Sequence, residues 1–268
     1  MNTSGASIDN LYLQVVRNLL TAPKVGNTRE RLNVQITLTD ITNNIVGVRG
    51  ISPAYLFGEL LWYFKADNTL SFISQFSSFW NHLSDDGITC NSAYGFLMMR
   101  KHGFDQLQKV IDILKADPNS RRAKININFP NPNVDTTKDE PCTMSLHFNI
   151  RKGELYCTAV MRSNDIWFGF PYDVAFFTEL QKYVANQLHV GYGSYTHFAV
   201  SMHMYDRDYE KLEPLIHRSA TDKPESKPVV WNRRRFYQNV DLLYEVAKTE
   251  GKDALMKKLA ELKIYKEE

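Results

Sequence analysis

MRSNDIWFGFPYD, residues 161–173, combines an arginine, a serine, two aspartates, a Gly-Phe-Pro sequence and bulky aromatic residues. A helix interior does not tolerate a glycine and a proline as close together as Gly169 and Pro171, and a regular strand does not carry a row of polar residues. The stretch therefore predicts a strand end that runs into a turn and then a helix. Rigid corners of this kind commonly carry ligand-binding groups.

Alternating apolar residues on both sides of this corner predict a sheet. Two alternating runs separated by the turn sequence RKGE predict a hairpin before the corner. After it we expect a helix over about 174–188 and then another strand. The alternating residues are, in chain order, Met144, Leu146, Phe148, Ile150, then Leu155, Cys157, Ala159, Met161, then Phe198, Val200, Met202 and Met204.

The first half of the chain adds helices and two further strands. Helical spacing of apolar residues predicts helices near 8–19 and 104–114, and alternation predicts strands with Leu32, Val34, Ile36 and Leu38 and with Ile125, Ile127 and Phe129. In SPAYLFGELLWYF, Ser52 fits an N-cap and Pro53 the first helical position. That helix is apolar nearly all round, so we expect it to be buried, and its one acid, Glu59, needs a reason.

Helices and strands do not alternate strictly along the chain, which predicts an α+β fold with a large mixed or antiparallel sheet packed with helices. The 268 residues, 43% of them hydrophobic, suffice for one large core. We therefore expect a single domain over 1–268. A proline-containing loop covers 130–141, and two helices are expected to close the chain.

Composition excludes several classes of protein. The formal charge of +2 reflects nearly balanced acids and bases, and the only dense basic run is RRR at 233–235, so we expect no nucleic-acid partner. Without a signal peptide, a membrane-spanning apolar run or a lipidation motif, we expect a soluble protein with no membrane partner. Cys90, Cys142 and Cys157 have no paired spacing. This favours a reducing compartment, the cytoplasm, with neither a disulfide framework nor a metal site.

Cys142 is the candidate nucleophile, because it follows a loop and begins a strand in the sequence EPCT. A lone free cysteine is more often a small buried hydrophobe, and Cys90 and Cys157 fit that interpretation. A reactive thiolate needs positive charge nearby. Arginines could supply it and could also bind phosphate in a forked geometry if the fold gathers them. The candidates are Arg29, Arg121, Arg122 and Arg162, with Ser163 beside the last.

The segments FGELLWYF, CNSAYG, DPNSRR, EPCT, MRSNDIWFGFPYD and MHMYDRD, in this order, resemble the signature segments of the thymidylate synthase superfamily. The resemblance runs from about residue 29 to 208 and becomes weak after about 209, where we expect a divergent helical part. Within the superfamily, the sequences of these segments are most similar to those of deoxycytidylate hydroxymethylases. Such activity is typical of DNA-modifying viruses, which would place the protein in the host cytoplasm.

The resemblance implies a role for each matching residue. Cys142 would attack C6 of a pyrimidine nucleotide, and C5 would then take a one-carbon unit from the co-substrate 5,10-methylenetetrahydrofolate. Glu59 would organise water and proton transfer, which explains an acid in an apolar helix. A homodimer is implied, in which the Arg121 and Arg122 pair reaches the partner's site. The remaining matches are Arg29, with Arg31 as its alternative, Arg162 and Ser163 for phosphate, His203 and Tyr205 for the sugar, Asp165 and Tyr94 for catalysis, and Trp80, Asp165 and Gly169 for the folate.

Asp173 stands where thymidylate synthases have an asparagine that pairs with uracil. Cytosine presents an N4 donor and an unprotonated N3, which a carboxyl group can satisfy when it carries a proton. A site with one hydrogen-bonding polarity rejects the other base by roughly 10⁴-fold. The alternative is an aspartate that caps the following helix.

The sequence also bears on the product. Hydride from the folate gives a methyl group at C5, and water gives a hydroxymethyl group. Thr143, Leu83 and the ending KIYKEE depart from the methylating pattern at elements that hold the folate, which favours water. The expected function is thus dCMP 5-hydroxymethylation. The alternatives are dUMP hydroxymethylation, a divergent thymidylate synthase, cytidylate C5-methylation, CMP hydroxymethylation and a silent nucleotide binder that kept the fold.

Overall fold

The computed structural model describes residues 1–217 and 229–265, which form two compact units. Within the described residues, unit 1 comprises 1–50, 106–128 and 142–217, and unit 2 comprises 51–105, 129–141 and 229–265. The chain crosses between the units repeatedly, so no single point in the sequence separates them. The α+β class is confirmed, because unit 1 contains the sheet with helices packed on it and unit 2 is helical.

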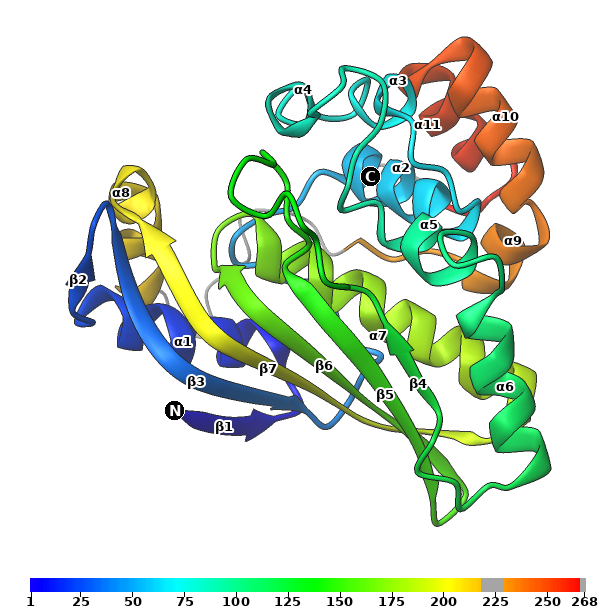
Figure 1. Ribbon diagram of the computed structural model, residues 1–268, viewed down its shortest axis with the longest axis horizontal. Coiled ribbons are helices and arrows are strands. Elements are labelled where there is room, and N and C mark those ends of the chain that lie inside the picture. Colours follow the sequence, from blue (N-terminus) through cyan, green and yellow to red (C-terminus); the bar gives the residue numbers. More distant parts are fainter. Residues whose placement is uncertain (218–228, 266–268) are drawn as a thin grey trace. The chain divides into compact units, whose positions relative to one another are not determined.

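The sheet of unit 1 is mixed and has the strand order β1-β3-β7-β6-β5-β4, with β2 paired to β3 (Figure 1). Two of its pairings, β1 with β3 and β6 with β7, are parallel, and the rest are antiparallel. The strands are β1 (Asn2–Gly5), β2 (Lys24–Val25), β3 (Thr28–Leu38), β4 (Lys124–Asn126), β5 (Thr143–Arg151), β6 (Glu154–Asp165) and β7 (Gly191–Tyr205).

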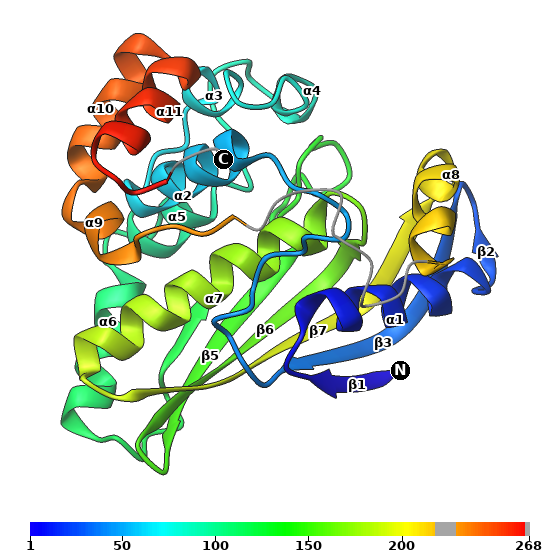
Figure 2. The same cartoon turned by 180° about the vertical axis from the view of Figure 1, so that it is seen from behind.

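Helices α1 (Ile8–Leu20) and α7 (Gly169–Leu188) lie across one face of this sheet, as Figure 2 shows. The apolar face of α1 includes all four residues expected from the spacing, Ile8, Leu11, Val15 and Leu19. The buried apolar positions of β6 are Leu155, Cys157, Ala159 and Met161, the four that alternate in the sequence. The other helices of unit 1 are α6 (Gln106–Ala116), η1 (Asp206–Asp208), α8 (Tyr209–Leu212) and η2 (Glu213–His217).

The predicted hairpin is formed by β5 and β6. Lys152 and Gly153, at its tip, have φ angles of 51° and 77°. Two successive positive φ angles match the right-handed twist of the flanking strands, and glycine accepts such an angle without strain.

The alternation of the strands breaks along one line across the sheet. Leu32, Met144 and Val200 alternate in the sequence with the other apolar residues of their strands, but they are 61%, 43% and 40% exposed. Each of four neighbouring strands is irregular at the same level of the sheet. The strand β5 has a bulge at Met144, and β3 has a φ of 55° at Asn33. In β6 and β7 the buried residues change from odd to even positions in the sequence. An irregular residue turns the rest of its strand over, because side chains alternate with a period of two. The ends of these strands therefore present the opposite set of side chains.

The strand predicted over Ile125, Ile127 and Phe129 is shorter than expected. The strand β4 ends at Asn126, and Phe129 is 37% exposed outside it.

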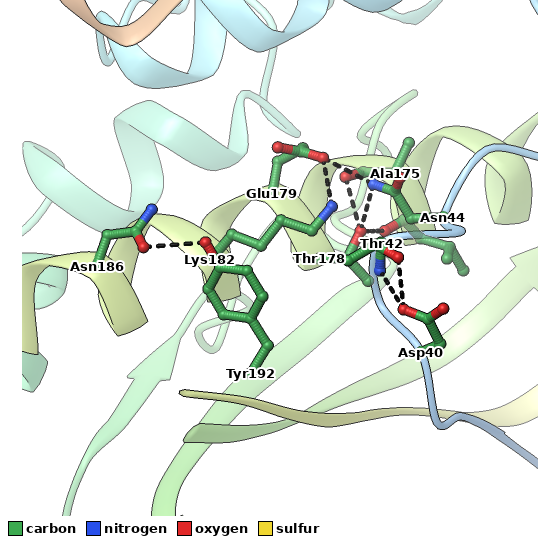
Figure 3. A network of polar contacts seen from close by, with 10 residues as sticks. Asp40, Thr42, Asn44, Ala175, Thr178, Glu179, Lys182, Asn186 and Tyr192 are labelled. Carbon is green, nitrogen blue, oxygen red and sulfur yellow. Dashed lines mark hydrogen bonds and ion pairs between the residues drawn. The ribbon is translucent and has the colours of Figure 1, made fainter. Parts of the chain in front are cut away.

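A loop after β3 is anchored on α7 by buried polar contacts (Figure 3). The amide of Asn44 donates to Thr178 Oγ1 at 2.8 Å and to Glu179 Oε1 at 2.9 Å. Glu179 also pairs with Lys182 at 2.8 Å, with both side chains almost fully buried. Because a buried charge is costly without a partner, the ion pair stabilises Glu179 within α7, and the Asn44 amide fixes the loop on the helix.

Unit 2 contains α2 (Pro53–Phe64), α3 (Leu70–Ile73), α4 (Trp80–Leu83), α5 (Tyr94–Met99), α9 (Arg233–Gln238), α10 (Val240–Glu250) and α11 (Lys252–Glu261). The start of α2 is as predicted, since the Ser52 side chain accepts from the Tyr55 N–H and Pro53 follows it. Two helices were expected to close the chain, whereas the described residues 229–265 contain three, α9, α10 and α11. No helix in the described ranges of the chain is long and apolar enough to cross a membrane.

Candidate active site

The corner after β6 differs from its prediction in one respect. Asp165 ends β6, and its carboxylate accepts from the N–H groups of Trp167 and Phe168 at 3.0 and 3.1 Å, which turns the chain. The helix α7 then begins at Gly169, five residues earlier than expected, and includes Pro171. Proline is tolerated there because the first N–H groups of a helix have no partner within it.

Asp173 lies inside α7 and accepts a hydrogen bond from the side chain of a neighbouring strand. Its Oδ2 atom is 2.7 Å from Nδ2 of Asn164 in β6. The N-cap alternative is wrong, since Phe168 occupies that position and makes no side-chain cap. The carboxyl group is half-buried. Desolvation raises its pKa to about 7, against the opposing effect of the Asn164 hydrogen bond.

Gly169 leaves room for this hydrogen bond. A Cβ atom at position 169 would stand 3.0 Å from Nδ2 of Asn164 and 3.4 Å from Oδ2 of Asp173. A larger residue would crowd the amide at its contact with the carboxyl group.

A buried polar chain continues behind Asn164. Its Oδ1 atom is 3.0 Å from Nε2 of His197, and Nδ1 of His197 is 2.9 Å from the Tyr195 hydroxyl. All three side chains are at most 2% exposed. Burial lowers the pKa of His197 to about 3, so the ring is neutral near pH 7. Sequence reasoning missed these residues, although polar side chains at buried strand positions were a signal.

The ends of β6 and β7 bring several predicted residues together. Asp165 pairs with His203 across the two strands, and Glu30 of β3 pairs with His203 from the other side. The Ser163 hydroxyl lies 3.4 Å from Nδ1 of His203, and the rings of His203 and Tyr205 meet at 5.2 Å. Burial lowers the pKa of His203, and the charge of Asp165 opposes that shift.

Cys142 directly precedes β5 and is half-buried, whereas Cys90 and Cys157 are buried. Its carbonyl accepts from the Arg162 N–H at 2.8 Å, so the cysteine is fixed beside the start of the corner sequence. Burial raises the pKa of Cys90 to about 12 and raises that of Cys157 as well. These two thiols are packing groups, as expected. Thr143, in contrast, faces the core and is 0% exposed, with its hydroxyl on the Met161 sulfur at 3.1 Å.

The arginines fall into separate places in unit 1. Arg29 and Arg31 of β3 donate to backbone carbonyls at the end of α1 and just beyond it, Arg29 to Ala22 at 3.2 Å and Arg31 to Thr21 at 3.4 Å. Arg162 is exposed beside Cys142.

Arg121 and Arg122, also exposed, lie far from Cys142 of the same chain. They precede Ala123, whose carbonyl accepts from the Phe148 N–H. Phe148 is six residues along β5 from Cys142, which corresponds to about 20 Å at the rise of an extended strand. The described chain therefore does not bring this pair to its own cysteine.

The predicted residues of unit 2 form a group of their own. The Tyr55 hydroxyl donates to Glu59 Oε1 at 2.8 Å and accepts from the Trp80 indole N–H at 3.1 Å. Tyr63 donates to the same glutamate oxygen at 3.4 Å, and its ring stacks on that of Tyr94 at 5.4 Å. Tyr55 and Tyr63 were missed, although their positions four residues before and after Glu59 place all three on one helix face.

Arg49 is a further residue that sequence reasoning missed. Its guanidinium lies 4.6 Å from the ring centre of Trp167 and 5.5 Å from that of Tyr172. It thus packs on the corner from the loop that Asn44 anchors, at a range typical of cation–π contacts. Its sequence context gave no signal for this contact.

Metal ligands are not grouped in the part of the chain that the structure describes. Within it, no three His, Cys, Asp or Glu side chains are placed to hold a metal ion.

A half-buried cysteine thus lies beside an arginine-bearing strand, and the helix that follows this strand carries a carboxyl group near its start. A family model described as thymidylate synthase matches residues 12–243. The chain belongs to the thymidylate synthase family.

Three relatives illustrate the similarity. The chain is 29% identical to a deoxyuridylate hydroxymethyltransferase of Bacillus phage SP01, in a match that covers 77% of this chain. It is 32% identical to a deoxyuridylate hydroxymethyltransferase of Pseudomonas phage M6, in a match that covers 64% of this chain. It is 29% identical to a thymidylate synthase of Clostridium beijerinckii, with 78% of this chain and 82% of that protein covered. The matches cover only 59% and 50% of the two phage proteins.

The two phage relatives bear on the predicted base. They are named for deoxyuridylate, whereas the sequence resemblance pointed to deoxycytidylate hydroxymethylases. The comparisons thus support family membership and favour the dUMP alternative over the dCMP expectation.

Proposed function

We propose that the protein transfers a one-carbon unit from 5,10-methylenetetrahydrofolate to C5 of a pyrimidine deoxynucleotide monophosphate. Water then adds to this unit and gives a 5-hydroxymethyl product. The proposed base is cytosine. The observation that supports cytosine is the carboxyl group of Asp173, which stands where the sequence resemblance implies an asparagine in thymidylate synthases. Its pKa of about 7 allows a proton to be present near neutral pH. A protonated carboxyl group can donate to N3 of cytosine and accept from N4.

Cys142 is the proposed nucleophile for C6 of the base. Of the three cysteines of the chain, it is the one that is half-buried. Arg162 of β6 lies next to it, since the Arg162 N–H donates to the Cys142 carbonyl. Exposed positive charge at this point favours the thiolate and also suits a phosphate group. Addition of sulfur to C6 makes C5 nucleophilic, which is the step that one-carbon transfer needs.

A homodimer completes the proposed phosphate site. Arg121 and Arg122 are about 20 Å from Cys142 of their own chain by the strand geometry given above. A second copy can supply them. Within unit 1, α1 and α7 lie on one face of the sheet, and the other face, toward the viewer in Figure 1, is the proposed contact with that copy. Leu32, Met144 and Val200 are exposed apolar residues of β3, β5 and β7 that such a contact would cover.

The corner suits a reduced folate. Phe168 is 50% exposed and adjoins the half-buried Asp165 carboxylate. An exposed ring beside a hydrogen-bond acceptor fits a flat heterocycle that carries N–H groups. When bound, methylenetetrahydrofolate supplies the one-carbon unit. Asp165 and Gly169 are the proposed contacts in unit 1, and Trp80 is the proposed contact in unit 2.

Glu59 and Tyr94 are the proposed groups for proton transfer. In unit 2 the Glu59 carboxylate is held by two tyrosine hydroxyls, which fixes its position. A positioned carboxylate can orient a water molecule for attack. His203 and Tyr205, side by side on β7, remain the proposed contacts to the sugar hydroxyl, and Ser163 supports the phosphate.

A second candidate is hydroxymethylation of dUMP, favoured by the names of the two phage relatives. A protonated carboxyl group can also donate to O4 of uracil and accept from N3–H, so Asp173 does not exclude this base by charge alone.

The experiment is a competition between equimolar dCMP, CMP and dUMP in the presence of methylenetetrahydrofolate, with products identified by mass spectrometry. We expect a hydroxymethyl mass gain on dCMP without oxidation of the folate. A product on dUMP alone would establish the second candidate, a methyl product would contradict the role of water, and no product on any nucleotide would overturn the proposed function.

A further inference from the structure

The carboxyl group of Asp173 can accept either base, and the outcome depends on which oxygen carries the proton. Cytosine needs a donor opposite N3 and an acceptor opposite N4, and uracil needs the reverse. A symmetric, freely protonated carboxyl group would satisfy both. Selection therefore needs a neighbouring group that makes the two oxygens of Asp173 unequal.

Asn164 makes them unequal. Its Nδ2 atom donates to Oδ2 of Asp173 at 2.7 Å, so Oδ2 acts as an acceptor and a proton on the group is directed to Oδ1. If the amide were turned over, its oxygen would face Oδ2 and would draw the proton there instead. The orientation of a single amide thus sets the polarity of the carboxyl group.

His197 and Tyr195 hold that orientation. The amide oxygen of Asn164 can only accept, so Nε2 of His197 is the donor in their 3.0 Å contact. Because the buried ring is neutral, its Nδ1 then accepts from the Tyr195 hydroxyl at 2.9 Å. As long as Nε2 of His197 carries the ring proton, turning the amide over would place an N–H group against the N–H of His197 and break that buried hydrogen bond.

Two neighbouring residues hold the row of hydrogen-bonded side chains Asn164, His197 and Tyr195 in place, although neither belongs to that row. The Phe170 ring meets the His197 ring edge-on at 5.0 Å, and Gly169 leaves the space that the amide occupies. The line of irregular residues across the sheet turns Asn164 to the face that His197 occupies. Strict alternation in β6 would have pointed position 164 to the other face.

We propose that Asn164, oriented by His197 and Tyr195, fixes which oxygen of Asp173 carries a proton and thereby decides between cytosine and uracil. The three residues act through Asp173, so they are positioning residues. The inference rests on the proposed function, since it needs a pyrimidine nucleotide at this site.

The test is calorimetric binding of dCMP and of dUMP to the full chain and to three variants. His197→Phe keeps a ring and removes the donor, His197→Gln restores a donor, and Tyr195→Phe removes only the far hydroxyl. We expect the wild type to favour one base by about 100-fold or more, and His197→Phe to reduce that ratio at least tenfold. His197→Gln should recover part of the ratio, and Tyr195→Phe should give an intermediate value.

Asn44→Leu is the matched control. Asn44 lies in the loop after β3, and its buried amide donates two hydrogen bonds to α7, one to Thr178 and one to Glu179 (Figure 3). The substitution removes both bonds at a point farther along α7 than Asp173. It should lower the melting temperature without changing the ratio between the bases. An equal loss of selectivity in this control would show that the His197 effect is a general loss of packing, and would overturn the inference.

A second readout does not depend on binding. Nitrogen-15 NMR of the histidine rings should show His197 neutral and protonated on Nε2 from pH 5 to 8, and protonation on Nδ1 would overturn the inference. Equal binding of both bases by the wild type, or an unchanged ratio in folded His197→Phe, would also overturn it. Binding of neither nucleotide would instead overturn the proposed function.

Discussion

The backbone N–H of Arg162 donates to the carbonyl of Cys142 at 2.8 Å, so a cation-bearing residue and the cysteine are joined through the main chain. Since this bond does not involve the thiol, it remains available when the sulfur is removed. The pair therefore allows the chemistry of Cys142 to be tested separately from stability.

Cys142→Ala should abolish turnover, by at least 10³-fold, because a hydroxyl-free and sulfur-free residue cannot add to C6. Product formation and the release of tritium from C5 of the labelled nucleotide are the measurements. Cys157→Ala serves as the control, since that thiol is buried and its raised pKa keeps it protonated. Residual tritium release by folded Cys142→Ala would show that another group is the nucleophile.

Stability should fall as the pH rises through the titration of Asp173. Its pKa is raised from 3.8 to about 7, so between these values the folded state binds more protons than the unfolded state. The stabilisation is complete below about pH 4 and is lost as the pH approaches 7, by on the order of 2–4 kcal/mol for a half-buried group. Urea unfolding from pH 4.5 to 8 should show a smaller decline for Asp173→Asn than for the wild type. Parallel curves would contradict the raised pKa.

Tyr55→Phe should destabilise the protein more than Tyr63→Phe. The Tyr55 hydroxyl donates to Glu59 at 2.8 Å and also accepts from Trp80, whereas the Tyr63 contact with Glu59 is 3.4 Å long. We expect a loss of about 1–3 kcal/mol for Tyr55→Phe, and less than about 1 kcal/mol for Tyr63→Phe. Denaturant unfolding measures both, and the reverse order would show that the hydroxyl of Tyr63 is the principal support of the glutamate.

Gly169→Ala should weaken nucleotide binding through the Asn164 amide. The new Cβ atom would stand 3.0 Å from Nδ2 of Asn164, which forces the amide away from Asp173. We expect a cost of about 1–3 kcal/mol in stability, typical of overpacking, and a raised KM for the nucleotide. Gly191→Ala is a control at another tight position, with its nearest side-chain contact at 3.3 Å on Glu154. Equal KM values for the two variants would contradict this role of Gly169.

Mixing two inactive variants should restore activity if the site is shared between subunits. Arg122→Ala and Cys142→Ala impair different halves of such a site, so a mixed dimer contains one site with neither change. Random exchange of subunits predicts recovery of about one quarter of the wild-type activity. Size-exclusion chromatography confirms the dimer, and the absence of recovery in mixed dimers would place both residues in one chain's site.

The elements of the fold were largely predictable from local patterns. The spacing of Ile8, Leu11, Val15 and Leu19 defines α1, and Ser52 with Pro53 defines the start of α2. The start of α7 was misplaced because Gly169 and Pro171 were taken for a turn. Residues in the first turn of a helix need no N–H partner, so sequence alone does not distinguish the two conformations.

In the candidate site, too, some features were predictable from the sequence and others were not. The thiol of Cys142, the carboxyl groups of Glu59 and Asp173 and the arginines are chemical properties of the sequence, and their order along the chain identified the family. The contacts of Tyr55 with Glu59 and of His197 with Asn164 were not foreseen. They join side chains through burial and chain reversal, which one-dimensional spacing does not encode.

The sequence by itself thus determined the α+β class and the family, because hydrophobic periodicity and residue chemistry are local properties, and it predicted Cys142 as the nucleophile. Only the tertiary structure decided which side chains meet. One irregular line across β3, β7, β6 and β5 inverts the ends of these strands and turns Asn164 inward, toward Asp173 and His197. The physical reason is that a one-residue change of register reverses every later side chain of a strand, and pairing with neighbouring strands fixes where that change occurs.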